Sequence, residues 1–454
     1  MIDPTVLEQV LRRAASRGAD FADVFIEDRA TTTLRFLSKK VEEATTGRDY
    51  GAGVRACYGD RSVYAYTNDV SPQGLLEAAE AVSRAYSAPQ KTLNFTLAGQ
   101  PRGGSGASGD VAQRLEVLRR ADAAARAYDP AVTQVDITLV DSLQRVLIAN
   151  SEGLLMSDVR PRTRCRIMAI AEGNGEKYAG FSGPGASDDL GYWQVVNLEE
   201  QARSAARTAV TMLRAGYAPA GKLPVVIGSD FGGVIFHEAC GHLLETTSVA
   251  KGASVLAGKL GERIASEVVT ALDDGTIGGS WGYLAVDDEG RPGQRTVLIE
   301  NGILQSYMVD RLGGQKTGYV PTGSARRQSY RYPPTSRMRN TYIAPGTATP
   351  EELISKVSFG LYAKKLGGGS VLPGTGDFNF KVEEAYLIKG GQLAEPVRGA
   401  SLIGNGPEVL QKIVAVGNDL QLTPGMCGSL SGMVPVTVGQ PSLLVSEITV
   451  GGRQ

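Results

Sequence analysis

Residues 223–245 read LPVVIGSDFGGVIFHEACGHLLE, and this stretch holds both histidines of the chain. Its first part, Leu223–Gly228, is apolar and rich in β-branched residues, which predicts a strand. Ser229 and Asp230 follow, and both residue types commonly cap the start of a helix. The apolar residues after them are spaced as on a helix. The stretch therefore predicts a strand that leads directly into a helix bearing the two histidines.

His237 and His242 form the pattern HExxxH with Glu238. On a regular helix a spacing of four residues places two side chains on one face, whereas a spacing of five rotates the second by about 140°. Two ligands on one zinc ion therefore require a distorted helix. Gly241 is the residue type that permits a π-bulge or a helix end within Ala239–His242. Glu238 stands beside a ligand, where it could accept a proton from a zinc-activated water.

A catalytic zinc site needs a third protein ligand and one open position. The residues alone leave the third ligand open, and the candidates are Glu245, Asp273-Asp274, Asp287-Asp288-Glu289, Cys240 and Cys427. The plainer alternative is that the two histidines are buried side chains on an amphipathic helix with a surface glutamate.

Composition excludes several classes of protein. The chain has 454 residues, 47 Lys+Arg against 48 Asp+Glu, and 42% hydrophobic residues, as an ordinary globular protein has. The near-neutral charge argues against a nucleic-acid binder with a broad basic face. No run approaches the ~18 apolar residues of a membrane span, and the start has no signal-type apolar core. Four scattered cysteines do not make a disulfide framework, so we expect a cytoplasmic protein.

The pattern along the chain predicts an α+β fold in two domains. Residues 1–218 are expected to form an α/β domain with a largely antiparallel sheet, and residues 219–454 a mainly-β domain that carries the HExxxH helix. A mobile loop or linker is expected at about 88–109. Helices are predicted at 4–17, 72–87, 110–127 and 197–215, and strands at 20–27, 31–37, 53–58, 62–66, 133–140, 145–149 and 163–171.

Several segments give the chain a specific resemblance to the TldD branch of the TldD/PmbA family, zinc metallopeptidases once described as modulators of DNA gyrase. The resemblance covers nearly the whole length. It is carried by GVRACYGDRSVYAYTND at 53–69, DFGGVIFHEACGHLLE at 230–245, DDGTIGGSWG at 273–282, DDEGRPGQRTVLIENGIL at 287–304, RRQSYRYPPTSRMRNTYI at 326–343, GDFNF at 376–380 and the last segment, GNDLQLTPGMCGSLSGMVPVTVGQPSLLVSEITVGG.

The resemblance implies a site and an assembly. It implies that zinc is held by His237, His242 and Cys427, with Glu238 as the base. A thiolate is a strong zinc ligand, and the flanking Gly425 and Gly428 would allow a tight loop to present it. The family also implies a dimer, either with itself or with a PmbA/TldE-like sibling that lacks HExxxH. Its enclosed site implies unfolded or short peptides as substrates.

The segment 326–343 interleaves arginines with tyrosines and allows three interpretations. It could be a solvated loop or a surface for single-stranded nucleic acid. The interpretation that suits a peptidase best is that Arg331, Arg337 and Arg339 hold carbonyls or a terminal carboxylate of the substrate.

The function predicted from sequence is a zinc-dependent peptidase that cleaves unfolded or short peptides through a metal-activated water, with Glu238 as general base. The alternative is a metal-stabilised binding protein that modulates a partner of the gyrase or toxin–antitoxin type without proteolysis. Nucleic-acid binding through the arginines of 326–343 is a third, less favoured possibility.

Overall fold

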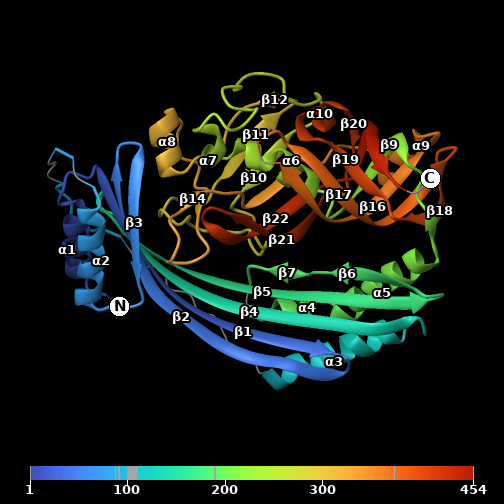
Figure 1. Cartoon of the computed structure of the whole chain (residues 1–454), viewed down its shortest axis with the longest axis horizontal. Helices are drawn as coiled ribbons and strands as arrows, with labels where there is room; N and C mark the ends of the chain where they lie inside the picture. Colours follow the sequence, from blue (N-terminus) through green and yellow to red (C-terminus); the bar gives the residue numbers. More distant parts are fainter. Residues whose placement is uncertain are drawn as a thin grey trace.

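The computed structural model describes residues 2–86, 88–89, 93–99, 111–188, 191–372 and 374–452. In Figure 1 a long sheet from the first half of the chain lies against a β-rich second half. Most of the linker predicted at about 88–109 lies outside the described residues. The described residues contain no helix long and apolar enough to cross a membrane.

The first sheet is antiparallel and has the order β3-β2-β1-β4-β5-β6, with β7 paired to β5. Its four central strands are longer than predicted, and the separate strands expected at 20–27 and 31–37 are one strand. A turn at Ser38-Lys39, where φ is 51° and 64°, follows β1, and neither residue is the Gly or Asn that such a turn favours. The strands are β1 (Phe21–Leu37), β2 (Lys40–Tyr58), β3 (Arg61–Thr67), β4 (Val132–Asn150), β5 (Leu155–Gly173), β6 (Glu176–Ser182) and β7 (Gly185–Ala186).

Helices cover one face of this sheet. Two of them pack on β1 and β2 at one end, and two more pack on β4 and β5 at the other end. The four long helices agree with the predicted ones to within a few residues. Side-chain caps at Asp3, Ser71 and Asn197 begin three of them. The helices are α1 (Pro4–Ala15), α2 (Pro72–Arg84), α3 (Val111–Arg126), α4 (Tyr192–Val195) and α5 (Leu198–Arg214).

The second half contains two larger sheets around one apolar core. One has the order β12-β11-β10-β15-β22-β21, and its strands are β10 (Ala271–Asp274), β11 (Arg295–Glu300), β12 (Ile303–Leu304), β15 (Asn340–Ile343), β21 (Gln421–Ser429) and β22 (Gly432–Gln440). The other has the order β16-β9-β23-β19-β17-β18-β8, with β20 beside β23. Its strands are β8 (Gly216–Tyr217), β9 (Gly221–Asp230), β16 (Phe359–Leu372), β17 (Asp377–Lys389), β18 (Gln392–Arg398), β19 (Ser401–Asn405), β20 (Ile413–Val416) and β23 (Leu443–Gly451).

Short elements connect these sheets. They include the small pair β13 (Ala325–Arg326) and β14 (Thr335–Ser336). The helices are α6 (Val234–Ala239), a 3-10 helix (Gly241–Leu244), α7 (Thr246–Val249), α8 (Arg311–Thr317), α9 (Pro350–Ser355) and α10 (Gly406–Gln411). The predicted α+β class, with an antiparallel first sheet and a mainly-β second half, is confirmed. The domain boundary near residue 218 stays a prediction.

Buried ion pairs join the two halves. The guanidinium of Arg55 lies 2.8 Å from Glu289, and that of Arg160 lies 2.6 Å from Asp288. These carboxylates belong to the acidic segment 287–289, which was one of the candidate sources of a third metal ligand. In the fold they hold the second half against the face of the first sheet that the helices leave uncovered.

Candidate metal centre

The histidine helix is shorter than predicted and ends within the HExxxH pattern. It does not start at Ser229 or Asp230, which belong to β9, but at Val234. Helix α6 ends at Ala239, and Cys240 has an irregular backbone with φ −132°. A 3-10 helix then begins at Gly241. The two histidines therefore lie on different helical segments, and this break turns the second one back toward the first.

Gly241 makes a close contact at this break. A Cβ atom at this position would lie 2.2 Å from Sδ of Met338, which is fully buried. A side chain at residue 241 would therefore require the Met338 side chain to move. The role of Gly241 is therefore in close packing, since its backbone is not in the left-handed region.

Cys427 completes a cluster with the two histidines. Its Sγ lies 3.2 Å from Nε2 of His242, and one potential ligand atom from each of Cys427, His237 and His242 lies within 4.8 Å of the others. The tight loop expected around Cys427 is wrong, because the residue lies inside β21 opposite Val434. A strand from the end of the chain therefore presents the thiol to a helix about 190 residues earlier.

The second histidine is oriented by a carboxylate. Nδ1 of His242 lies 3.0 Å from Oε2 of Glu245, which leaves Nε2 directed toward the thiol. Carboxylates that hold the outer nitrogen of a metal-binding histidine are common in metalloproteins. Glu245 was one of the candidate ligands, and here it contacts Nδ1 of His242.

The residues of the cluster fit a zinc ion. His237 is 2% exposed, and its Nδ1 has no hydrogen-bond partner among the described residues. Burial, and then the neighbouring His242, hold the pKa of His237 well below its ordinary value, so the ring is neutral and can donate a lone pair. Two imidazoles and one thiolate are a donor set that zinc prefers.

Glu238 lies at the edge of the cluster. Its Oε2 lies 3.7 Å from Nε2 of His242, and its side chain is 30% exposed. Burial raises the pKa of this carboxyl, although His242 opposes the shift. A carboxylate with a raised pKa, beside the ligands and reachable from outside, has the position and the basicity that a general base needs.

The remaining candidates for a third ligand lie outside this cluster. Cys240 is buried, and burial raises the pKa of its thiol. Asp273 pairs with Arg339 at 2.8 Å, and Asp274 accepts hydrogen bonds from Thr276. Within the described part of the chain, the cluster of His237, His242 and Cys427 is the one that could hold a metal.

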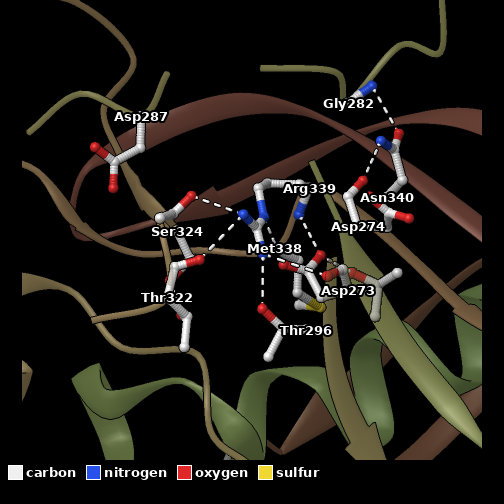
Figure 2. A network of polar contacts seen from close by, with 12 residues as sticks. Asp273, Asp274, Gly282, Asp287, Thr296, Thr322, Ser324, Met338, Arg339 and Asn340 are labelled. Atoms are coloured by element: carbon white, nitrogen blue, oxygen red, sulfur yellow. Dashed lines mark hydrogen bonds and ion pairs between the residues drawn. The ribbon is translucent and has the colours of Figure 1, made fainter. Parts of the chain in front are cut away.

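The predicted substrate arginines lie in internal contacts. Figure 2 shows Arg339 at the centre of a network with Asp273 and Thr296. Arg337 donates to the backbone carbonyl of Cys427 at 2.6 Å, so it supports the strand that carries the thiol. Both are fully buried. Arg331 is exposed and pairs with Asp49 at 2.7 Å. Substrate contact by these arginines stays a prediction, and the burial of Arg337 and Arg339 speaks against it.

Models of one protein family match most of the chain. The C-terminal domain of the PmbA/TldA metallopeptidases matches residues 220–452, their central domain matches residues 107–213, and their domain 1 matches residues 22–86.

Curated relatives are similar over nearly the whole length. A protein of Haemophilus influenzae called "Metalloprotease TldD homolog" is 39% identical, and the match covers 96% of this chain and 94% of the relative. A protein of the same name from Buchnera aphidicola is 35% identical, with 97% and 95% covered. A more distant one from Saccharolobus solfataricus, 25% identical with 97% and 99% covered, is called "Zinc metalloprotease TldD homolog".

Solved structures share the fold. A putative modulator of a DNA gyrase from Thermotoga maritima aligns with a TM-score of 0.81 at 22% identity, covering 98% of this chain and 99% of that one. TldE from Thermococcus kodakarensis aligns with a TM-score of 0.80 at 20% identity, covering 98% and 100%. At this identity the likeness concerns the fold alone.

Proposed function

The chain belongs to the PmbA/TldD metallopeptidase family, and we propose that it is a zinc-dependent peptidase with its metal held by His237, His242 and Cys427. The observation that carries the proposal is the convergence of three potential ligand atoms within 4.8 Å. Among the described residues Nδ1 of His237 has no hydrogen-bond partner, which supports the proposal, because a buried polar atom without a partner is costly unless something binds there.

Zinc bound at such a site lowers the pKa of water and polarises a peptide carbonyl. The protein's own groups supply the remaining functions. Glu238 accepts the proton of the attacking water and passes it to the leaving amine. Glu245 keeps the ring of His242 in one orientation through Nδ1. Arg337 fixes the backbone of β21 at Cys427, so the thiol stays in place during turnover.

The proposed substrates are unfolded or short peptides. An extended peptide can be recognised through main-chain hydrogen bonds, which give little preference for particular side chains. The proposal includes a dimer, either of this chain or with a TldE-like sibling, and a cytoplasmic location. The structural likeness to a protein named TldE supports the sibling as one possible partner.

Substitution Glu238→Gln tests the catalytic part of this proposal. We expect turnover of an unfolded peptide to fall about 100- to 10,000-fold, as for loss of a general base, with zinc still bound at the wild-type level. Glu262→Gln is the matched control, because Glu262 is exposed and pairs with Lys259 away from the cluster.

The measurement combines peptide hydrolysis with elemental zinc analysis of both variants. Wild-type turnover in Glu238→Gln would contradict the role of the base. Bound zinc with no turnover in the wild-type chain, alone or with a sibling, would favour the alternative of a metal-stabilised binding protein.

A further inference from the structure

A cavity of about 470 Å³ lies between the first sheet and the second half of the chain. One wall is formed by β1, β4 and β5, and the other by residues near β13 and by the β21–β22 hairpin. Figure 1 shows these strands facing the hairpin. Seven of the lining residues are arginines, and Asp288 is the one carboxylate among the lining residues that the structure describes.

Four of these arginines form a row on β5. Residues 160–166 read RPRTRCR, and side chains two residues apart on a strand share a face, so the arginines at 160, 162, 164 and 166 all face the cavity. Their cross-strand neighbours on β4 are neutral: Gln144, Ser142, Val140 and Thr138. On β5 itself, Asp158 pairs with Arg160 at 3.0 Å, whereas β4 places no carboxylate directly opposite any of the four arginines.

Few of these guanidinium groups have an acidic partner. Asp288 is already occupied, because it accepts from Arg160 at 2.6 Å and from the backbone N–H of Arg327 at 2.7 Å. Arg326 and Arg164 each donate to one backbone carbonyl. Among the described residues, Arg162 has neither a hydrogen bond nor an ion pair, and its Nε is buried without a partner.

This unbalanced charge is unfavourable in the protein alone. Burial, and then the guanidinium of Arg160, lower the pKa of Arg162 to about 10. Burial, and then the guanidinium of Arg162, lower that of Arg326 to about 9. Charges taken out of water are normally paired, so the geometry leaves room for an anion between these side chains.

We propose that this cavity is a binding site for a small organic anion, with a carboxylate or phosphate group held by Arg162, Arg164 and Arg326. Guanidinium groups bind both kinds of oxyanion through paired N–H donors. The rest of the lining includes Trp281, Leu284, Met426 and Met433, so the ligand also carries an apolar or aromatic body.

The proposed anion site is separate from the candidate metal centre. Met426 and Met433 line the cavity, whereas Cys427 and Val434 lie in the apolar core of the second half. Successive side chains of a strand point to opposite faces. The two sites therefore lie on opposite faces of the β21–β22 hairpin, and ligand binding can be tested without peptidase activity.

The test is calorimetric titration of the full chain at low ionic strength with phenyl phosphate, 3-phenylpropionate and inorganic phosphate. We expect one saturable site that binds at least one of the two aromatic probes about 10-fold or more tightly than inorganic phosphate, because the apolar lining adds contact area. The aromatic probe that binds more tightly shows whether the site prefers a phosphate or a carboxylate.

Arg162→Gln should weaken binding of the preferred probe by about 10-fold or more, the value of a charge-assisted hydrogen bond. Arg145→Gln is the matched control, since Arg145 is an exposed residue of β4 next to Gln144 and on the opposite face. The unliganded Arg162→Gln variant should unfold at the same temperature as the wild type or higher, because it loses like-charge repulsion.

Three results would overturn the proposal. They are no saturable binding of any probe to the wild-type chain, equal weakening by Arg162→Gln and Arg145→Gln, and unchanged binding in Arg162→Gln. Unchanged binding in Arg162→Gln is also the result expected if the probe binds at the metal centre, because this substitution changes none of the residues there.

Discussion

Arg339 and Arg162 represent two regions in which arginines gather inside the molecule. Arg339 has Asp273 at 2.8 Å, and its other donors meet the carbonyls of Thr322 and Gly323. Arg162 lies in the row on β5 and has no such partner among the described residues. The residue type is the same, but one charge is neutralised within the chain and the other is not.

This difference separates structural arginines from ligand-binding ones. A buried charge with a full set of partners holds segments together, and its removal leaves the partner unpaired. A charge without a partner contributes little to folding and is available to a ligand. The same distinction applies at the candidate metal centre, where Glu245 is the partner of Nδ1 of His242, whereas Nδ1 of His237 has no hydrogen-bond partner among the described residues.

The largest expected effect comes from breaking the neutralised pair. Arg339→Gln should lower the free energy of unfolding by about 3–5 kcal/mol, because the buried Asp273 carboxylate loses its counter-ion. Chemical denaturation followed by circular dichroism measures this loss. Arg331→Gln is the control, since its exposed pair with Asp49 is worth about 0–1 kcal/mol. Equal losses in both variants would contradict the distinction.

The next effect concerns two buried cysteines, of which Cys427 belongs to the cluster with the histidines and Cys240 does not. Cys427→Ala should reduce the apparent zinc affinity by about two to three orders of magnitude, the share of one ligand in a zinc site. Cys240→Ala should leave zinc affinity unchanged, because Cys240 lies outside the cluster of potential ligand atoms. Competition with a chromophoric chelator measures both, and a larger loss in Cys240→Ala would show that the ligand is misassigned.

The smallest effect is expected for the group that orients a ligand. Glu245→Gln should weaken zinc binding about 10- to 100-fold, the usual effect of losing an outer carboxylate partner. The same chelator competition measures it, with Glu262→Gln as an exposed control. An unchanged affinity in Glu245→Gln would mean that the orientation of His242 is fixed by packing alone.

The four long helices of the first half could be predicted because their apolar residues recur at helical spacing and three of them begin with a side-chain cap. The short helix α4 was not predicted, and none of its residues is buried. The strands could be located, but their lengths could not be predicted, since the segment 28–30 separated the two strands expected at 20–27 and 31–37. Pairing on both sides keeps β1 continuous there, with Ala30 opposite Arg48 and Leu143. Such pairing between distant segments is not encoded in local periodicity.

At the candidate site, residue chemistry indicated the two histidines and the need for a break near Gly241. It could not choose the third ligand, because Cys427 comes from a strand at the far end of the chain. That assignment came from the family resemblance, and it stays a proposal that the geometry supports. The alternating arginines of 160–166 were visible in the sequence, but their meaning depends on the neutral neighbours that only the fold supplies.

The two faces of β5 also constrain how the first sheet can assemble. Cys165, Ile167 and Ala169 face an apolar core under the helices, and they alternate with the arginines that face the cavity. A slip of β5 by one residue against β4 would exchange the two sets and bury several guanidinium groups among aliphatic side chains. The alternation of arginines with apolar residues along β5 therefore also helps to set the register of β5 against β4.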